Sequence, residues 1–186
     1  MRAQIIDRIL AVVDSAIILQ SDVQLAMRFG LVPSAGGPDP TSAVLDRLID
    51  RQLILAEVAR YAPPDPAEAE IDRHIADIRA RAGGEFDAVL LAGGIGVDQL
   101  RRDVRDDLRI DAYLQQRFGA IQPTEDEILQ YYRDHTASFS QNGVVRSFDD
   151  AHDVARAALI ADRRGATIRD WLSGLRRRAN VNVLPR

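Results

Sequence analysis

Strand-type patterning occurs near the two ends of this sequence, and helical patterning fills the chain between them. Residues 8–13 and 16–19 are rich in Ile, Val and Leu and are separated by Asp14 and Ser15, which predicts a β-hairpin. Residues 181–184, Val-Asn-Val-Leu, form the other strand-type segment. Because an unpaired strand edge is costly, we expect this strand to join the hairpin. The sequence therefore predicts a mainly α fold with a small antiparallel sheet, formed by the N-terminal β-hairpin and the C-terminal strand.

Helical periodicity dominates the interior of the chain. Residues 41–61 carry a broad apolar stripe at i, i+3, i+4 and i+7 spacing, which is typical of a central core helix. Capping patterns predict helix starts at Ser21, Asp65 and Thr124. A last helix is expected to weaken at Gly165. The predicted helices cover residues 22–29, 41–61, 65–81, 98–118, 124–139 and 147–178, with a short segment at 85–91 and a polar connection at 140–146.

Composition excludes several classes of chemistry. The 186 residues are 46% hydrophobic and 28% charged, as in a soluble globular protein. The absence of cysteine excludes thiol nucleophiles, Cys-ligated zinc and iron–sulfur clusters. All 24 basic residues are arginine, so lysine-dependent Schiff-base and P-loop mechanisms are excluded as well. No stretch approaches the ~18 apolar residues of a membrane span.

The sequence contains no recognisable catalytic or metal-binding motif. His74, His135 and His152 are far apart and lack the i, i+4 partners that a helical metal site uses. The glycine-rich run at 93–96 lacks the Lys-Ser/Thr ending of a phosphate loop and is interpreted as a helix-breaking loop. We therefore predict no catalytic residues, no metal site and no cofactor.

A run of arginines at 101, 102, 105 and 109 is the strongest positive feature. Aspartates are interleaved with these arginines at i, i+4 distances, which favours salt bridges within the same helix. The net charge of −4 also argues against a nucleic-acid partner. We predict neither nucleic-acid binding nor a membrane span.

Two ordered segments carry a resemblance to a known family. Residues 6–22, IDRILAVVDSAIILQSD, and residues 44–55, VLDRLIDRQLIL, resemble the first hairpin and the second helix of SurA-type periplasmic chaperones. Further similar segments lie at residues 65–78, 90–104, 123–139 and 171–184. The resemblance covers most of the chain.

One departure from that family is large. Its members carry one or two parvulin-type prolyl isomerase domains between the tyrosine-containing helix and the C-terminal helix, whereas this chain has residues 140–146 there. A seven-residue loop cannot form such a domain. We expect an N-terminal chaperone domain at 1–139, a short linker at 140–146, and residues 147–186 completing the same domain, without isomerase activity.

The resemblance implies an ATP-independent periplasmic chaperone, a holdase, whose partners are unfolded outer-membrane or exported proteins. Only residues 1–4 precede the first apolar segment, so no signal peptide is visible and periplasmic localisation rests on the resemblance. Candidate client-binding residues are apolar residues near loops and outside the clearest core stripes, for which ordinary packing is the alternative. They are Met27, Phe29, Leu31, Val32, Phe86, Leu90, Leu91 and Ile95.

Two other functions stay open at this point. The missing isomerase domain favours, as an alternative, a dedicated envelope-assembly interaction module that binds one specific partner. An enzyme would need a site that the motifs do not reveal. The long loop at 33–40 and the separated terminal elements would also permit a homodimer by segment exchange.

Overall fold

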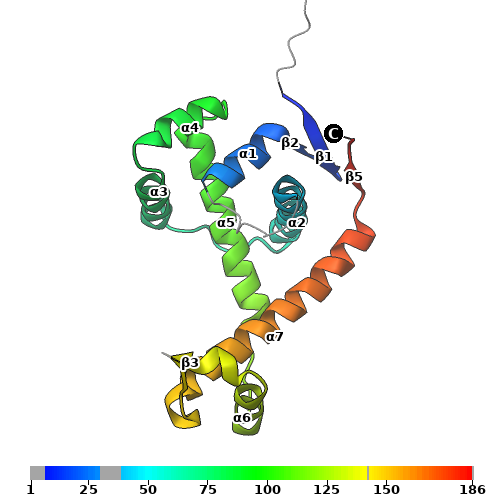
Figure 1. Ribbon diagram of the computed structural model, residues 1–186. Helices are drawn as coiled ribbons and strands as arrows, with labels where there is room; N and C mark the ends of the chain where they lie inside the picture. The colour runs from blue at the N-terminus through cyan, green and yellow to red at the C-terminus, as the bar shows by residue number, and fades with distance from the viewer. Residues whose placement is uncertain (1–6, 30–38, 142, 186) are drawn as a thin grey trace, which may run out of the picture. The chain divides into compact units, whose positions relative to one another are not determined.

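The computed structural model describes residues 7–29, 39–141 and 143–185 of the chain. The fold is mainly helical with a small antiparallel sheet, as predicted (Figure 1). Residue contacts divide the chain into two compact units: unit 1 comprises Met1–Tyr113 and Leu172–Arg186, and unit 2 comprises Leu114–Trp171. The chain positions 139 and 146, at which we placed segment boundaries, both fall within unit 2.

The sheet of unit 1 unites the two ends of the chain. β1 (Ile9–Val13) pairs antiparallel with β2 (Ala16–Leu19) on one side and with β5 (Val181–Val183) on the other, in the order β2-β1-β5. Asp14 turns the hairpin with a positive φ of 52°, a conformation that aspartate tolerates better than most residues. Its backbone N–H donates to the Asn180 carbonyl at 2.8 Å. The predicted pairing of the last strand with the hairpin is confirmed.

Two helices of unit 1 follow the hairpin. α1 (Gln20–Arg28) begins directly after β2, and α2 (Pro40–Tyr61) is the predicted core helix. The prediction that Ser21 caps α1 is wrong: Ser21 lies in the first turn and its hydroxyl donates to Asp7. Asp22 takes the capping role, because its carboxylate accepts a 2.8 Å hydrogen bond from the Leu19 N–H at the helix start.

A second layer of unit 1 consists of α3 (Glu68–Ala82), a 3₁₀ turn (Gly83–Glu85), α4 (Phe86–Ala92) and α5 (Val97–Phe118). α3 begins two residues later than predicted, with Ala67 rather than Asp65 at the cap. Asp65 lies instead near Arg109, with a carboxylate-to-guanidinium distance of 3.3 Å. One apolar cluster holds α1, α3, α4 and α5 together. It contains Leu25, Phe29, Ile71, Ile75, Ile78, Phe86, Val89, Leu90, Leu100 and Val104.

Unit 2 has a small core of its own. α6 (Glu125–Asp134), a 3₁₀ turn (Thr136–Phe139) and the first part of α7 (Phe148–Arg178) enclose it. Residues 140–146, predicted as a loop, contain a minimal hairpin of β3 (Ser140–Gln141) and β4 (Val144–Val145), and Gly143 supplies the positive φ of 79°. α7 continues through Gly165 as one helix. The core residues are Ile128, Phe139, Ala151, Ala155 and Leu159.

Candidate functional site: a groove in unit 1

A concave feature lies within unit 1. It is a groove of about 1250 Å³ bordered by β2, α1, α2, α5 and the end of α4 with the loop after it. We call it the unit 1 groove. Its size exceeds the roughly 300–1,000 Å³ of typical small-molecule pockets. The groove therefore has room for a ligand larger than a common metabolite.

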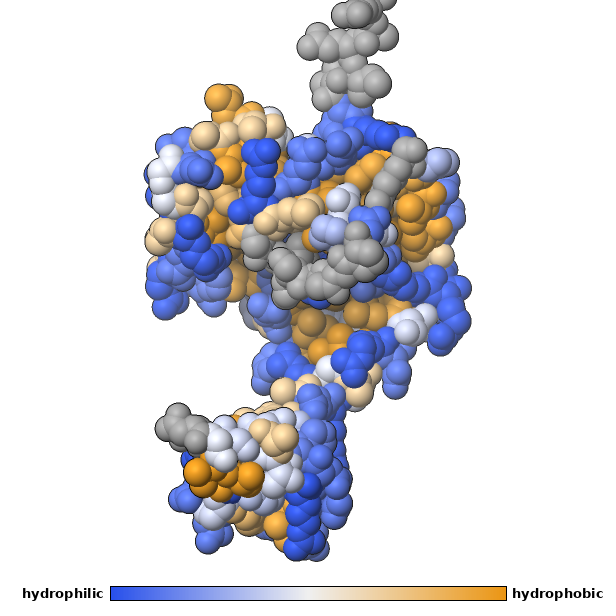
Figure 2. All heavy atoms as spheres, in the orientation of Figure 1, coloured by the Kyte–Doolittle hydropathy of each residue, from blue (hydrophilic) through white to orange (hydrophobic). Residues whose placement is uncertain are grey.

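Apolar side chains form much of the groove surface. Leu91, at the end of α4, is 83% exposed, and Ile17, on β2, is 53% exposed. Figure 2 shows apolar atoms, in orange, gathered over α4. Large aliphatic side chains left in water favour contact with another apolar surface. Behind them the lining includes Leu25, Ala26, Phe29, Leu48, Ile95 and Leu100.

Part of the lining is acidic. Asp103 and Asp107, one turn apart on α5, and Asp22 on α1 all line the groove. Arg51 of α2 reaches between them: its Nε donates to an Asp107 carboxylate oxygen at 2.6 Å, and another guanidinium nitrogen donates to the Asp103 carbonyl at 3.1 Å. We call Asp22, Asp103 and Asp107 the acidic floor of the groove.

Burial controls the ionisation of the acidic floor. It raises the pKa of Asp22, of Asp103 and of Asp107, and the nearby positive charge of Arg51 only partly offsets this rise. A hydrogen bond from Gln99 to Asp103 at 3.2 Å also favours the carboxylate form. The floor is thus a set of anions that a single guanidinium does not fully compensate.

The predicted client-binding residues lie in different environments. Leu91 is exposed on the groove, and Phe29 and Ile95 also line it although Phe29 is buried. Met27 is 42% exposed but lies outside the groove lining. Phe86 and Leu90 are buried in the apolar cluster, where Phe86 packs on Phe29 with ring centroids 5.7 Å apart. Leu31 and Val32 lie outside the described residues.

Sequence reasoning missed the groove's other contributors. Ile17 was assigned only to a strand, and Asp103 and Asp107 were interpreted as salt-bridge partners of the arginines in the same helix. The signal available was the spacing of Gln99, Asp103 and Asp107 at four-residue intervals along α5. That spacing places them on one face, but it does not reveal that α1 and α2 enclose this face.

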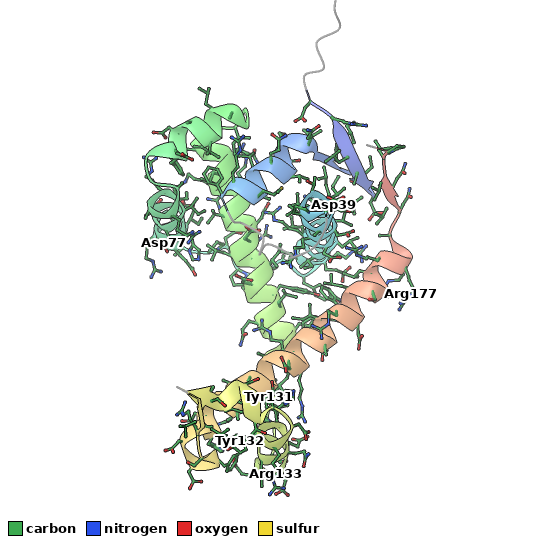
Figure 3. All side chains as sticks on the ribbon, in the orientation of Figure 1. Asp39, Asp77, Tyr131, Tyr132, Arg133 and Arg177 are labelled. Atoms are coloured by element: carbon green, nitrogen blue, oxygen red, sulfur yellow. The ribbon has the colours of Figure 1, made fainter. Side chains whose placement is uncertain are left out.

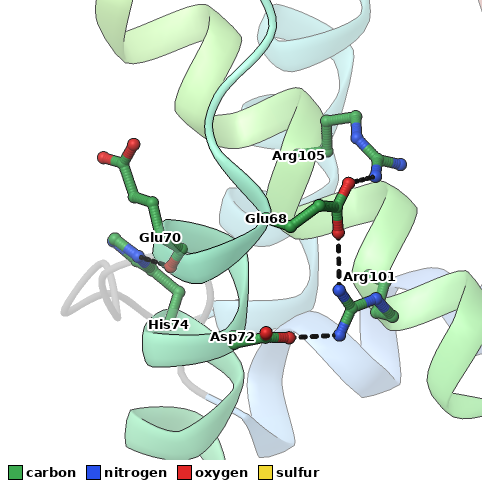
Figure 4. Close-up of polar contacts among 6 residues, drawn as sticks. All are labelled: Glu68, Glu70, Asp72, His74, Arg101 and Arg105. Carbon is green, nitrogen blue, oxygen red and sulfur yellow. Dashed lines mark hydrogen bonds and ion pairs between the residues drawn. The ribbon is translucent and has the colours of Figure 1, made fainter.

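The arginines of α5 are paired outside the groove. Arg101 contacts Glu68 at 2.7 Å and Asp72 at 2.5 Å, and Arg105 contacts Glu68 at 2.6 Å (Figure 4). These hydrogen bonds lower the pKa of Glu68 and raise that of Arg101. The sequence favoured salt bridges between arginines and aspartates of the same helix, whereas Glu68 and Asp72 belong to α3. The arginines therefore join two helices of unit 1.

The described residues contain neither a candidate metal cluster nor a helix that could span a membrane. No group of three or more His, Cys, Asp or Glu suited to a metal ion occurs among them. Within those same ranges, no helix combines the length and apolarity needed to cross a bilayer. A ring nitrogen of His152 lies 2.8 Å from the Glu125 carboxylate, and this contact raises the pKa of His152.

Unit 2 contains an aromatic cluster around Phe139. Tyr131 and Tyr132, labelled in Figure 3, lie on α6, and both rings pack near Phe139. The Tyr131 hydroxyl donates to Asp162 at 2.6 Å, and the Tyr132 hydroxyl donates to the Arg146 carbonyl at 2.6 Å. These contacts account for the tyrosines as structural residues of unit 2.

Comparison with known proteins finds similarity to chaperones. The chain is 29% identical to the Chaperone SurA of Xanthomonas oryzae pv. oryzae over 98% of its own length and 39% of that protein. It is 29% identical to Chaperone SurA of Pseudomonas putida, over 69% of this chain and 32% of that protein. The resemblance stated from the sequence is confirmed, and the chain spans about a third of the length of these relatives. No protein-family model matches it.

Proposed function

Because the chain is similar to proteins named Chaperone SurA along nearly its whole length, we propose that it is an ATP-independent periplasmic chaperone. It holds unfolded outer-membrane or other exported proteins and has no prolyl isomerase activity. The unit 1 groove, with exposed apolar side chains at its border, is the observation that carries this proposal.

A holdase acts by binding the unfolded state of another protein and keeping it from aggregating. Unfolded chains expose apolar side chains along extended segments, so their receptor needs apolar surface that is open to solvent. Leu91 and Ile17 provide such surface at the groove, and the half-buried Ile95 extends it inward. We assign client contact to these three residues, and Phe29 supports them from the core.

The absence of isomerase activity is supported by the segment between α6 and α7. Among its described residues, the segment 140–146 contains the strands β3 and β4, of two residues each. A catalytic domain does not fit in so short a segment. We keep the predicted organisation of a chaperone domain at 1–139, a linker at 140–146 and a completing segment at 147–186.

The test is light scattering of a denatured outer-membrane β-barrel protein diluted into buffer without nucleotide. We expect near-stoichiometric amounts of this protein to suppress aggregation. Unchanged scattering with several unrelated clients would contradict the proposal and favour the alternative, a module that binds one dedicated partner.

Three matched substitutions locate the activity. Leu91→Ser, at the groove, is expected to weaken suppression, whereas Val144→Ser, at a residue that is 69% exposed in unit 2, is expected to leave it unchanged. Met27→Ser tests an exposed apolar residue of unit 1 outside the groove lining. Equal loss in all three variants would show that general surface apolarity, not the groove, holds the client.

A further inference from the structure

The side chains that line the unit 1 groove carry more negative than positive charge. Six aspartates but only three arginines line it. Of the arginines, Arg8 donates to the Pro185 carbonyl at 2.8 Å, and Arg51 is held by Asp107 and the Asp103 carbonyl. The groove therefore combines apolar walls with an excess of negative charge.

We propose that the unit 1 groove selects extended unfolded segments in which apolar residues are accompanied by lysine or arginine. The apolar side chains of such a segment contact Leu91 and Ile17, and its cation lies at the acidic floor. This inference rests on the proposed holdase function and specifies which client segments the groove prefers.

The contacts of Arg51 indicate which hydrogen bonds a ligand cation could form at the acidic floor. Its guanidinium reaches Asp107 at 2.6 Å, while the Asp103 carboxylate receives its hydrogen bond from Gln99 and the Asp22 carboxylate from the Leu19 N–H. A carboxylate has room for several donors. A guanidinium or ammonium group from the client would therefore add a charge-assisted hydrogen bond that neutral donors do not supply.

Burial makes this contact more favourable than one on an open surface. All three floor carboxylates have a raised pKa because burial penalises their charge more than Arg51 compensates it. A second cation relieves that penalty, and the interaction is less screened than between fully exposed charges. An acidic client segment would meet repulsion at the same place.

The experiment measures fluorescence anisotropy of labelled peptides against the full chain. Three peptides share alternating Phe and Val residues and differ at two intervening positions, which hold Arg, Gln or Glu. We expect the Arg peptide to bind about tenfold more tightly than the Gln peptide, the effect of one good charge-assisted contact. The Glu peptide should bind most weakly, and added salt should reduce the differences.

Charge-neutral variants assign the preference to the floor. Asp22→Asn with Asp103→Asn removes two charges and keeps side-chain shape, and is expected to bring the Arg and Gln peptides within about twofold of each other. Asp77→Asn with Asp87→Asn makes the same change of net charge at exposed residues outside the groove lining and should preserve the tenfold ratio. Circular dichroism verifies that both double variants are folded.

Each outcome has a distinct meaning. Equal binding of all three peptides would overturn the charge preference and leave the holdase proposal standing, whereas no binding of any peptide would count against both. A preference that persists in the floor variant would place the cation elsewhere. A dimer that Leu91→Ser dissociates, detected by light scattering after size exclusion, would assign the groove to a second copy of the chain and overturn the proposal.

Discussion

The carboxylates of the acidic floor in unit 1 and the Glu127 carboxylate in unit 2 have pKa values shifted in opposite directions. In unit 1, burial beside the groove raises the pKa of Asp22, Asp103 and Asp107. In unit 2, an ion pair with Arg163 at 2.6 Å and a hydrogen bond from the Thr124 N–H lower the pKa of Glu127 to about 2. The acidic floor of the unit 1 groove therefore has uncompensated negative charge available for a ligand, whereas the charge of Glu127 stabilises unit 2 itself.

The largest expected effect tests whether the small core of unit 2 is needed for the groove of unit 1. Ile128 is fully buried, so Ile128→Ala should lower the free energy of unfolding of unit 2 by about 2–5 kcal/mol. Val154→Ala, at an exposed position of α7, is the control and should cost far less. Urea unfolding gives the stability, and peptide anisotropy reports the groove. Loss of peptide binding at a urea concentration where α6 has unfolded and unit 1 is still folded would show that the groove depends on unit 2.

Removal of β5 is the corresponding test for unit 1. Truncation before Val181 removes the strand pairing with β1 and the 2.9 Å hydrogen bond from the Leu184 N–H to the Leu10 carbonyl. We expect a loss of about 2–4 kcal/mol, from several backbone hydrogen bonds at roughly 1 kcal/mol each. Truncation of residue 186 alone is the control. An unchanged melting temperature after the longer truncation would contradict the role of β5.

The contributions of Glu127 and Asp103 to stability should change with pH in opposite directions. Glu127 has a lowered pKa in the folded state, so its contribution to stability is present above pH ~4.5 and is lost as the pH falls toward 2. Glu127→Gln should therefore reduce stability at neutral pH and flatten the acid side of the profile. Thr124→Ala, which removes the other half of this capping box, should cost about 1 kcal/mol. Thermal melts between pH 2 and 7 measure both variants, and a profile unaltered by Glu127→Gln would contradict this assignment.

The smallest effect concerns the acidic floor. Because the pKa of Asp103 is raised, its charged form opposes folding at neutral pH, and this cost is relieved as the pH falls through the folded-state pKa. Asp103→Asn should raise stability at pH 7 by roughly 0.5 kcal/mol, a small value because solvent screens part of the charge. The gain should disappear in acid, and Asp77→Asn serves as the exposed control. Lower stability of Asp103→Asn at pH 7 would show that Arg51 compensates this carboxylate fully.

The sequence predicted the architecture better than the site. Strand-type residues at 8–19 and 181–184 sufficed for the sheet, because few other segments offered a partner strand. The Thr124–Glu127 capping box was likewise readable, since both of its contacts are local. The start of α3 was misplaced because Asp65 interacts with Arg109, a residue distant in sequence.

The groove depends on contacts that periodicity does not encode. Phe86 and Leu90, chosen for their nearness to loops, are buried in the core, because α4 turns that face toward α1 and α3. Leu91, the next residue, is exposed on the groove. A single step along a helix thus separates core from surface, and it is the packing of neighbouring helices that decides which residue lies where.

The pairing of β1 with β5 couples the two ends of the chain during folding. Asp14 and Asn180, which hydrogen-bond at the end of this pairing, are 166 residues apart in the chain. Contacts between residues so distant in sequence form only after a long loop has closed, which slows folding. Until β5 arrives, β1 has an open edge of unsatisfied backbone groups. The folding protein therefore exposes for a time a strand edge that can pair with another chain.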